Sequence, residues 1–143
     1  MDTFSEFVEV QICRIHAVSL IGFHGKSMDE ERELFNRLNN RVDEIEAKKS
    51  TQYLVVSGKV PAPFIAVEVS ETANVPEGMA TFSIPEGEYV KFKFNKEHVG
   101  LFWANICTDE NQAKYNIDLS KPRFELFTPD MPTDIVEWYI PIS

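Results

Sequence analysis

The sequence predicts an α+β fold in which one strand-helix-strand-strand unit occurs twice, packing an antiparallel sheet against two helices. Strand-like and helix-like apolar patterns follow one another in the same order in residues 1–72 and 73–143, and corresponding elements are about 70 positions apart. The chain has 143 residues, of which 43% are hydrophobic. This composition suits one buried core, so we expect a single domain.

The first unit begins with the apolar stretch Val8–Phe23, which predicts one bent strand or two short ones. Ser27 and Glu30 then have the spacing of a capping box, and apolar residues at helical spacing continue to about Lys48. Two further strands are expected on either side of a loop that contains Pro61: Tyr53–Ser57 and Phe64–Val69.

The second unit begins with the alternating segment Met79–Phe94, whose centre, Pro85–Glu88, is expected to bend. Asn95 is placed to cap a helix with an apolar stripe. A polar connection that includes Asn111 and Lys114 follows. Two strands complete the unit, with Pro132 between them in the place that Pro61 has in the first unit: Arg123–Thr128 and Asp134–Ile142.

Equivalent elements of the two units predict how the halves pack together. Helices start near positions 29 and 96, and strand pairs start near 52/123 and 64/134. Two such units would either join their sheets or face each other across a pseudo-twofold axis, with both helices on one side. Ligands commonly bind in the cleft between paired half-domains, and we expect a cleft between these halves.

Charge and composition exclude several classes of protein. The formal net charge of −9 argues against a nucleic-acid partner, and 12% aromatic residues argue against disorder. The sequence has neither a basic segment followed by an apolar stretch at its start nor an apolar run long enough to cross a bilayer, which favours a cytoplasmic protein with no membrane partner. In that compartment we expect Cys13 and Cys107 to be reduced thiols, a disulfide being the less favoured alternative.

Metal and nucleophile chemistry have little support in the sequence. His16, His24 and His98 are scattered and lack the local spacing of zinc ligands, so we interpret them as ordinary surface or core residues and predict no metal or cofactor. Neither cysteine has a catalytic signature, and no phosphate-binding loop occurs.

Carboxylates inside apolar strands are the remaining candidates for chemistry. Strand alternation places Glu125 on one face with Phe127, and Glu137 on one face with Tyr139. For Glu68 and Glu137 we expect an ordinary solvent-facing position. For Glu125, sequence alone leaves both a half-buried and an exposed position open.

A carboxylate in an aromatic cleft has two uses that residue types do not separate. Desolvation strengthens its attraction for a cation, and aromatic faces attract the same guest. The same surroundings raise its pKa, which suits a general acid or base.

Three short segments and one tryptophan of this sequence occur together in a known family. The segments are similar to a Pro-x-Gly-x-Tyr turn, a Phe-Glu-x-Tyr strand and a closing Ile-Pro-Ile strand: Pro85–Tyr89, Phe124–Phe127 and Glu137–Ile142. Trp103 lies on the second expected helix, where the family often has a Trp. With its duplicated unit, the chain resembles over nearly its whole length the GyrI-like domain, the effector-binding domain of many AraC- and MerR-type transcription regulators.

The resemblance implies binding of hydrophobic, cationic or flat aromatic small molecules in the cleft. By position it makes Glu125 the cleft carboxylate, with Trp103 and Tyr89 beside it and Phe127 and Tyr139 as further candidates. Phe127 replaces the family's usual Tyr, so a hydroxyl that could assist proton transfer is missing. One family branch hydrolyses strained cyclopropane-containing drugs, and another inhibits DNA gyrase.

Three functional hypotheses follow. We favour a small-molecule-binding protein over an enzyme, and we expect no attached DNA-binding segment because the domain pattern fills the chain from about Val8 to Ser143. A hydrolase in which Glu125 activates water is the first alternative, and a module that interacts with another protein is the second. The sequence leaves the ligand's identity and the oligomeric state open.

Overall fold

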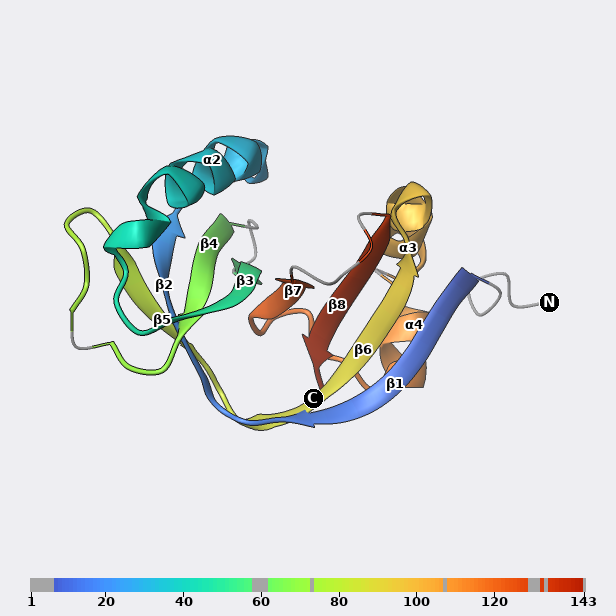
Figure 1. Ribbon diagram of the computed structural model, residues 1–143. Helices are drawn as coiled ribbons and strands as arrows, with labels where there is room; N and C mark the ends of the chain where they lie inside the picture. Colours follow the sequence, from blue (N-terminus) through green and yellow to red (C-terminus); the bar gives the residue numbers. More distant parts are fainter. Residues whose placement is uncertain are drawn as a thin grey trace.

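The computed structural model describes residues 7–57, 62–72, 74–106, 108–128, 132 and 134–142. Within these ranges, eight strands form one antiparallel sheet in the order β1-β6-β8-β7-β3-β4-β2-β5 (Figure 1). The predicted α+β fold with a duplicated unit is confirmed. The strands are β1 Val8–Ile15, β2 Val18–His24, β3 Lys48–Ser57, β4 Ala62–Val69, β5 Ala80–Ile84, β6 Gly87–Asn95, β7 Arg123–Phe127 and β8 Ile135–Pro141.

The first strand of each unit pairs with a strand of the other unit. β1 pairs with β6 of the second unit, and β5 pairs with β2 of the first. The sheet therefore has a first lobe (β5-β2-β4-β3) and a second lobe (β1-β6-β8-β7), which meet where β3 pairs with β7. The two long segments β1–β2 and β5–β6 bend sharply at the base of the molecule and connect the lobes there (Figure 1).

Strand register confirms the internal repeat and refines its length. Ser19 lies opposite Val69 in the first unit, and Val90 lies opposite Ile140 in the second. Both partners are displaced by 71 positions between the units. The pseudo-twofold relation expected from the sequence is thus present in the hydrogen-bonded ladders themselves.

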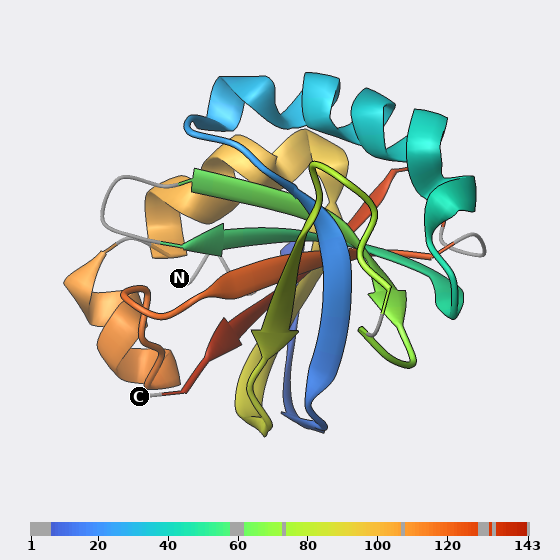
Figure 2. The same ribbon diagram turned by 90° about the vertical axis from the view of Figure 1, so that its left-hand side faces the viewer.

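Both long helices lie on the same side of the sheet, one over each lobe (Figures 1 and 2). A 3-10 turn, Met28–Glu30, leads into α2, Glu31–Arg41, and the predicted Ser27/Glu30 capping box is present. A second 3-10 turn, Lys96–His98, leads into α3, Val99–Ile106, and the Asn95 side chain accepts a hydrogen bond from the Glu97 amide as expected.

Two predicted boundaries need correction. Helical structure in the first unit ends at Glu44, before the predicted Lys48, because Ala47 adopts a left-handed conformation and β3 already begins at Lys48. The polar connection around Asn111 is in fact a helix, α4, Asp109–Tyr115. The Thr108 side chain caps its start and a left-handed Asn116 ends it.

The two faces of the sheet carry separate apolar clusters. The helix-side cluster is centred on residues such as Phe92, Phe102 and Leu38, and the opposite face holds a cluster that includes Tyr53 and Phe124. Cys13 is a half-buried free thiol. Two residues discussed above, Cys107 and Pro61, lie outside the described residues.

Candidate binding cleft

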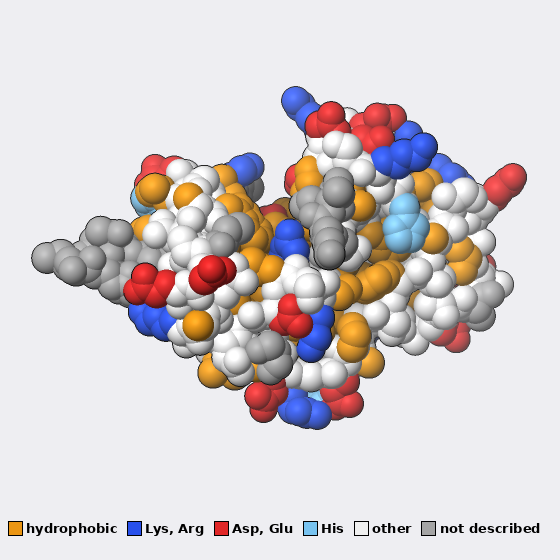
Figure 3. Space-filling view, turned by 180° about the vertical axis from the view of Figure 1, so that it is seen from behind, with side chains coloured by type: hydrophobic (Ala, Val, Ile, Leu, Met, Phe, Trp, Pro, Cys, Tyr) orange, Lys and Arg blue, Asp and Glu red, His pale blue; other side chains and the backbone are white. Residues whose placement is uncertain are grey.

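A cavity of about 800 Å³ lies on the helix side, where the two lobes meet. Its walls come from α2 and α3 and its floor from β3, β7 and β8. Seen from behind, a notch opens between the lobes, and hydrophobic side chains line it (Figure 3). The lining residues are Met28, Asp29, Glu31, Arg32, Phe35, Asn36, Asn39, Gln52, Leu54, Lys96, Val99, Trp103, Glu125, Phe127, Val136 and Trp138.

Glu125 occupies the middle of this floor. In the β3–β7 pair it lies directly opposite Leu54, and these two residues are themselves 71 positions apart. The pair therefore lies on the pseudo-twofold axis, with a carboxylate on one side and an apolar side chain on the other. On its other edge β7 pairs with β8, which places Trp138 next to Glu125.

The environment of Glu125 favours its protonated form. Desolvation by burial is the main cause that raises its pKa to about 7; the charge of Glu31 adds to the shift, and the charge of Lys96 opposes it. Among the described residues, none donates a hydrogen bond to the Glu125 carboxylate or forms an ion pair with it. Burial also raises the pKa of Glu31, again against the effect of Lys96.

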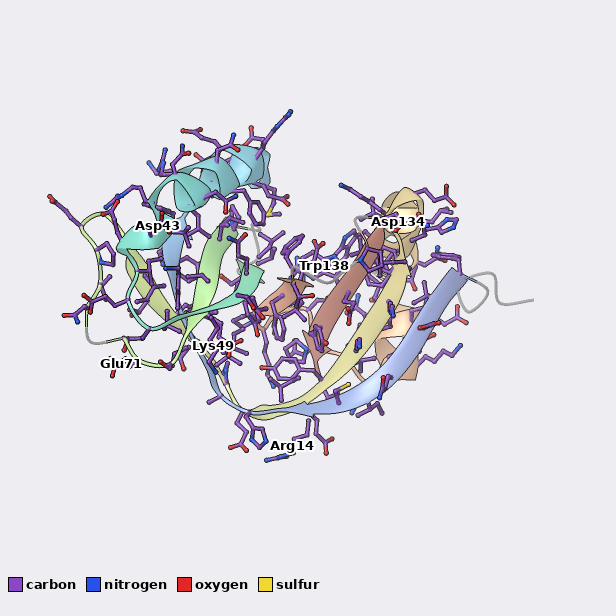
Figure 4. All side chains as sticks on the ribbon, in the orientation of Figure 1. Arg14, Asp43, Lys49, Glu71, Asp134 and Trp138 are labelled. Atoms are coloured by element: carbon purple, nitrogen blue, oxygen red, sulfur yellow. The ribbon has the colours of Figure 1, made fainter. Side chains whose placement is uncertain are left out.

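Aromatic rings surround the carboxylate on both sides. Trp103 of α3 meets Trp138 edge-on, with ring centroids 5.0 Å apart. Phe35 of α2 meets Phe127 of β7 in the same manner at 5.2 Å. Trp138 lies on the floor between the lobes (Figure 4), is 4% exposed, and its buried indole N–H has no hydrogen-bond partner among the described residues. The cleft thus combines the Glu125 carboxyl group on its floor with four aromatic side chains.

The structure brings together three of the five site residues named from the sequence. Glu125, Trp103 and Phe127 line the cavity. Tyr89 and Tyr139 lie on the opposite face of the sheet, in the second apolar cluster. There the Tyr89 hydroxyl donates to the backbone carbonyl of Pro85 at 2.9 Å, and Tyr139 stacks on Phe124 with centroids 4.8 Å apart.

Glu68 and Glu137 also lie on that opposite face, and the solvent-facing position expected for both is wrong. Their side chains are only 20% and 12% exposed. Glu137 forms an ion pair with Lys91 at 2.8 Å, and Glu68 accepts a hydrogen bond from the Tyr53 hydroxyl at 2.9 Å. Both carboxylates are therefore partly buried beside the second apolar cluster and are held by partners there.

Sequence reasoning missed several residues that line the cavity. Trp138 is the clearest case, because strand alternation places it on the face opposite to Glu137 and Tyr139, and no role was predicted for that face. Phe35 belongs to the apolar stripe of its helix, and the sequence pattern does not distinguish a residue that lines a cavity from one that packs in the core. Glu31 lies in the first turn of its helix, where an acidic side chain is favourable in any helix and so gives no signal of a binding site.

A family model described as "Cass2: Integron-associated effector binding protein" matches residues 11–142. The chain belongs to this family. The GyrI-like resemblance is thereby confirmed, and the chain is an effector-binding domain for small molecules. No curated protein sequence matches it.

Solved structures share this family's fold at low sequence identity. SAV2435, solved bound to tetraphenylphosphonium, superposes with a TM-score of 0.73 at 15% identity, covering 94% of both chains. The EcmrR C-terminal domain gives 0.70 at 11% identity, covering 95% of this chain and 98% of its own. An integron cassette protein of Vibrio cholerae gives 0.63 at 15% identity, covering 96% and 98%.

The described residues contain no helix with both the length and the apolar character needed to cross a membrane. They also contain no group of three or more His, Cys, Asp or Glu side chains placed to hold a metal ion.

Proposed function

We propose that this effector-binding domain binds hydrophobic organic cations in the cleft centred on Glu125. One observation carries the proposal: a carboxylate without a described partner lies at the centre of a cavity of about 800 Å³ and is surrounded by aromatic rings. Trp103 and Phe127 would contact the ligand from α3 and β7, and Trp138 would contact it from the floor.

The physical chemistry of this site favours cations that are bulky and weakly hydrated. A half-buried carboxylate attracts a positive charge more strongly than an exposed one, because less water screens the interaction. Indole faces add cation–π attraction of about 0.5–2 kcal/mol each. A lipophilic cation loses little hydration on entering the cleft, whereas a small, strongly hydrated one loses much.

The neighbour SAV2435 supports this ligand class, since it was solved with tetraphenylphosphonium, a lipophilic cation. At 15% identity the likeness concerns the fold, so the argument for this chain depends on its own cleft residues. Flat aromatic cations meet the same requirements as tetraphenylphosphonium: one positive charge for Glu125 and apolar surface for the walls.

A titration with tetraphenylphosphonium tests the proposal. Both tryptophans of the chain, Trp103 and Trp138, line the cleft, so binding should change the intrinsic fluorescence, and calorimetry gives the affinity independently. Tetraphenylborate, which has the same shape and the opposite charge, is the matched ligand control. We expect the cation to bind and the anion not to bind.

Variants separate the electrostatic contribution from shape. Glu125→Gln keeps the size of the side chain and should weaken tetraphenylphosphonium binding by about tenfold or more at pH 8. Glu33→Gln makes the same charge change on an exposed side chain of α2 that pairs with Arg37, and should leave the affinity unchanged. Equal binding of cation and anion, or full affinity in Glu125→Gln, would contradict the proposal.

Hydrolysis of strained electrophilic compounds is a second candidate function. The observation that favours it is the pKa of Glu125, about 7, which lies where a general acid or base is most effective. Incubation with reactive cyclopropane-containing drugs, followed by mass spectrometry, tests it. Turnover that Glu125→Gln abolishes would support hydrolysis, whereas recovery of unchanged compound from the wild-type protein would exclude it for these substrates.

A further inference from the structure

Five charged side chains line the cleft, and their signs nearly cancel. Asp29, Glu31 and Glu125 are acidic, and Arg32 and Lys96 are basic. With all five ionised, three negative charges and two positive charges leave a net charge of −1. A guest with one positive charge therefore makes the cleft electrically neutral.

Lys96 has a special position among these charges. It lies in the turn that leads into α3, across the cleft from Glu31 on α2. Its backbone is fixed, because its amide donates to the carbonyl of Asp134 at 2.7 Å and Asn95 caps the same turn. Its ammonium group acts on both Glu31 and Glu125, whose pKa values it lowers.

Arg32, the other basic residue of the cavity, is next to Glu31 on α2, whereas Lys96 lies in the turn before α3 on the other side of the cavity. Lys96 forms no ion pair within 4.0 Å with any described carboxylate, so its charge is shared between the two acids and not confined to one of them. Lys96 thus offsets one of the three carboxylates that line the cavity.

We propose that Lys96 determines ligand valence, making the cleft selective for organic cations with one positive charge over those with two. The inference rests on the proposed function and names the residue that sets its specificity. A second charge on the guest would face Lys96 with no net negative charge of the cavity left to compensate it, and burying an uncompensated charge is costly. Without Lys96, three negative charges and one positive charge line the cavity, and their net charge of −2 matches a dication.

Two bipyridinium ions test this on one scaffold. The N-methyl ion carries one charge and the N,N′-dimethyl ion carries two, and each is used at pH 8 to displace tetraphenylphosphonium in a calorimetric competition. In the wild-type protein we expect the singly charged ion to compete better. In Lys96→Gln we expect the ratio of the two affinities to move toward the doubly charged ion by about tenfold or more.

Arg37→Gln is the matched control, because it removes one positive charge from an exposed side chain of α2 that pairs with Glu33 and does not line the cavity. It should leave the affinity ratio close to that of the wild type. An unchanged ratio in Lys96→Gln, an equal change in Arg37→Gln, or failure of the singly charged ion to displace tetraphenylphosphonium would overturn the proposal. If tetraphenylphosphonium itself does not bind the wild-type protein, it is the proposed function that fails.

Discussion

Folding raises the pKa of the Glu125 carboxyl group, so that this group titrates close to neutral pH. Burial raises its pKa to about 7, so the protonated and ionised forms coexist there. Only the ionised form attracts a cation. Ligand binding and proton release are consequently linked at this one residue, and the sense of the linkage is fixed: a bound cation lowers the pKa of Glu125, and a bound proton weakens cation binding.

The affinity for tetraphenylphosphonium should therefore rise with pH. Between pH 6 and pH 8 the ionised fraction of Glu125 increases from a small to a large share, which predicts an affinity gain of up to about tenfold. The ligand does not titrate in this range, and the described residues that line the cavity include no histidine. Calorimetry at the two pH values measures the gain. Glu125→Gln should show a flat profile, and a flat wild-type profile would refute the linkage.

The raised pKa of Glu125 also predicts that the stability of the folded protein decreases as the pH rises, whereas the ligand affinity increases. Because the folded pKa is about 7 and the ordinary value is 4.5, the folded protein binds more protons than the unfolded chain between these values, and stability falls as pH rises through this window. Above it, Glu125→Gln should be more stable than the wild type by about 1–3 kcal/mol, with little difference near pH 4.5. Urea unfolding at both pH values measures this. A stability difference that does not vary with pH would contradict it.

At the scale of the elements, strands β2 and β4 pack against each other at Gly22 with no room for a side chain. A side chain there would meet the backbone of Ile65 in β4, so Gly22→Ala should destabilise the fold by about 1–3 kcal/mol. Gly87 at the start of β6 has open space around it, and Gly87→Ala should change stability by no more than about 0.5 kcal/mol. Chemical denaturation of both variants under one condition is the measurement. Comparable losses would show that the strands are not packed so closely.

Local signals in the sequence were sufficient for most elements. The capping residues Ser27 and Asn95 marked both helix starts, and strand alternation marked the sheet. Helix α4 was not predicted, because it has capping residues at its ends, Thr108 and Asn116, but no apolar stripe between them. Its polar sequence gave no periodicity to detect.

The site was less predictable than the elements because it depends on pairing between distant strands. Alternation separates Trp138 from Tyr139 but does not say which of them shares a face with Glu125. That follows from the β7–β8 register, in which Glu125 lies opposite Trp138 and Phe124 lies opposite Tyr139. No local pattern encodes this register, so the sequence prediction named the tyrosine and omitted the tryptophan.

At the scale of the whole molecule, the exchange of first strands makes each unit depend on the other. β1 has its hydrogen-bonding partner, β6, in the second unit, and β5 has its partner, β2, in the first. Neither unit can complete its own lobe. The two lobes should consequently unfold together as one cooperative unit.

Dividing the chain between residues 72 and 73 tests this dependence. Each fragment alone should be unfolded or self-associated, since an edge of its sheet is left unpaired. The two fragments mixed in equal amounts should assemble into a folded pair with the circular dichroism spectrum and tetraphenylphosphonium affinity of the whole chain. Cooperative unfolding of either fragment as a monomer would refute the dependence.

The pairing of Leu54 with Glu125 on the pseudo-twofold axis also bears on how such a site could arise. Two identical subunits related by a true twofold axis would place the same residue on both sides of it: two leucines without charge, or two carboxylates that repel each other. Joining the units in one chain frees each position to change alone. A duplicated gene can therefore encode a single acid on the symmetry axis, whereas a dimer of identical halves cannot have one.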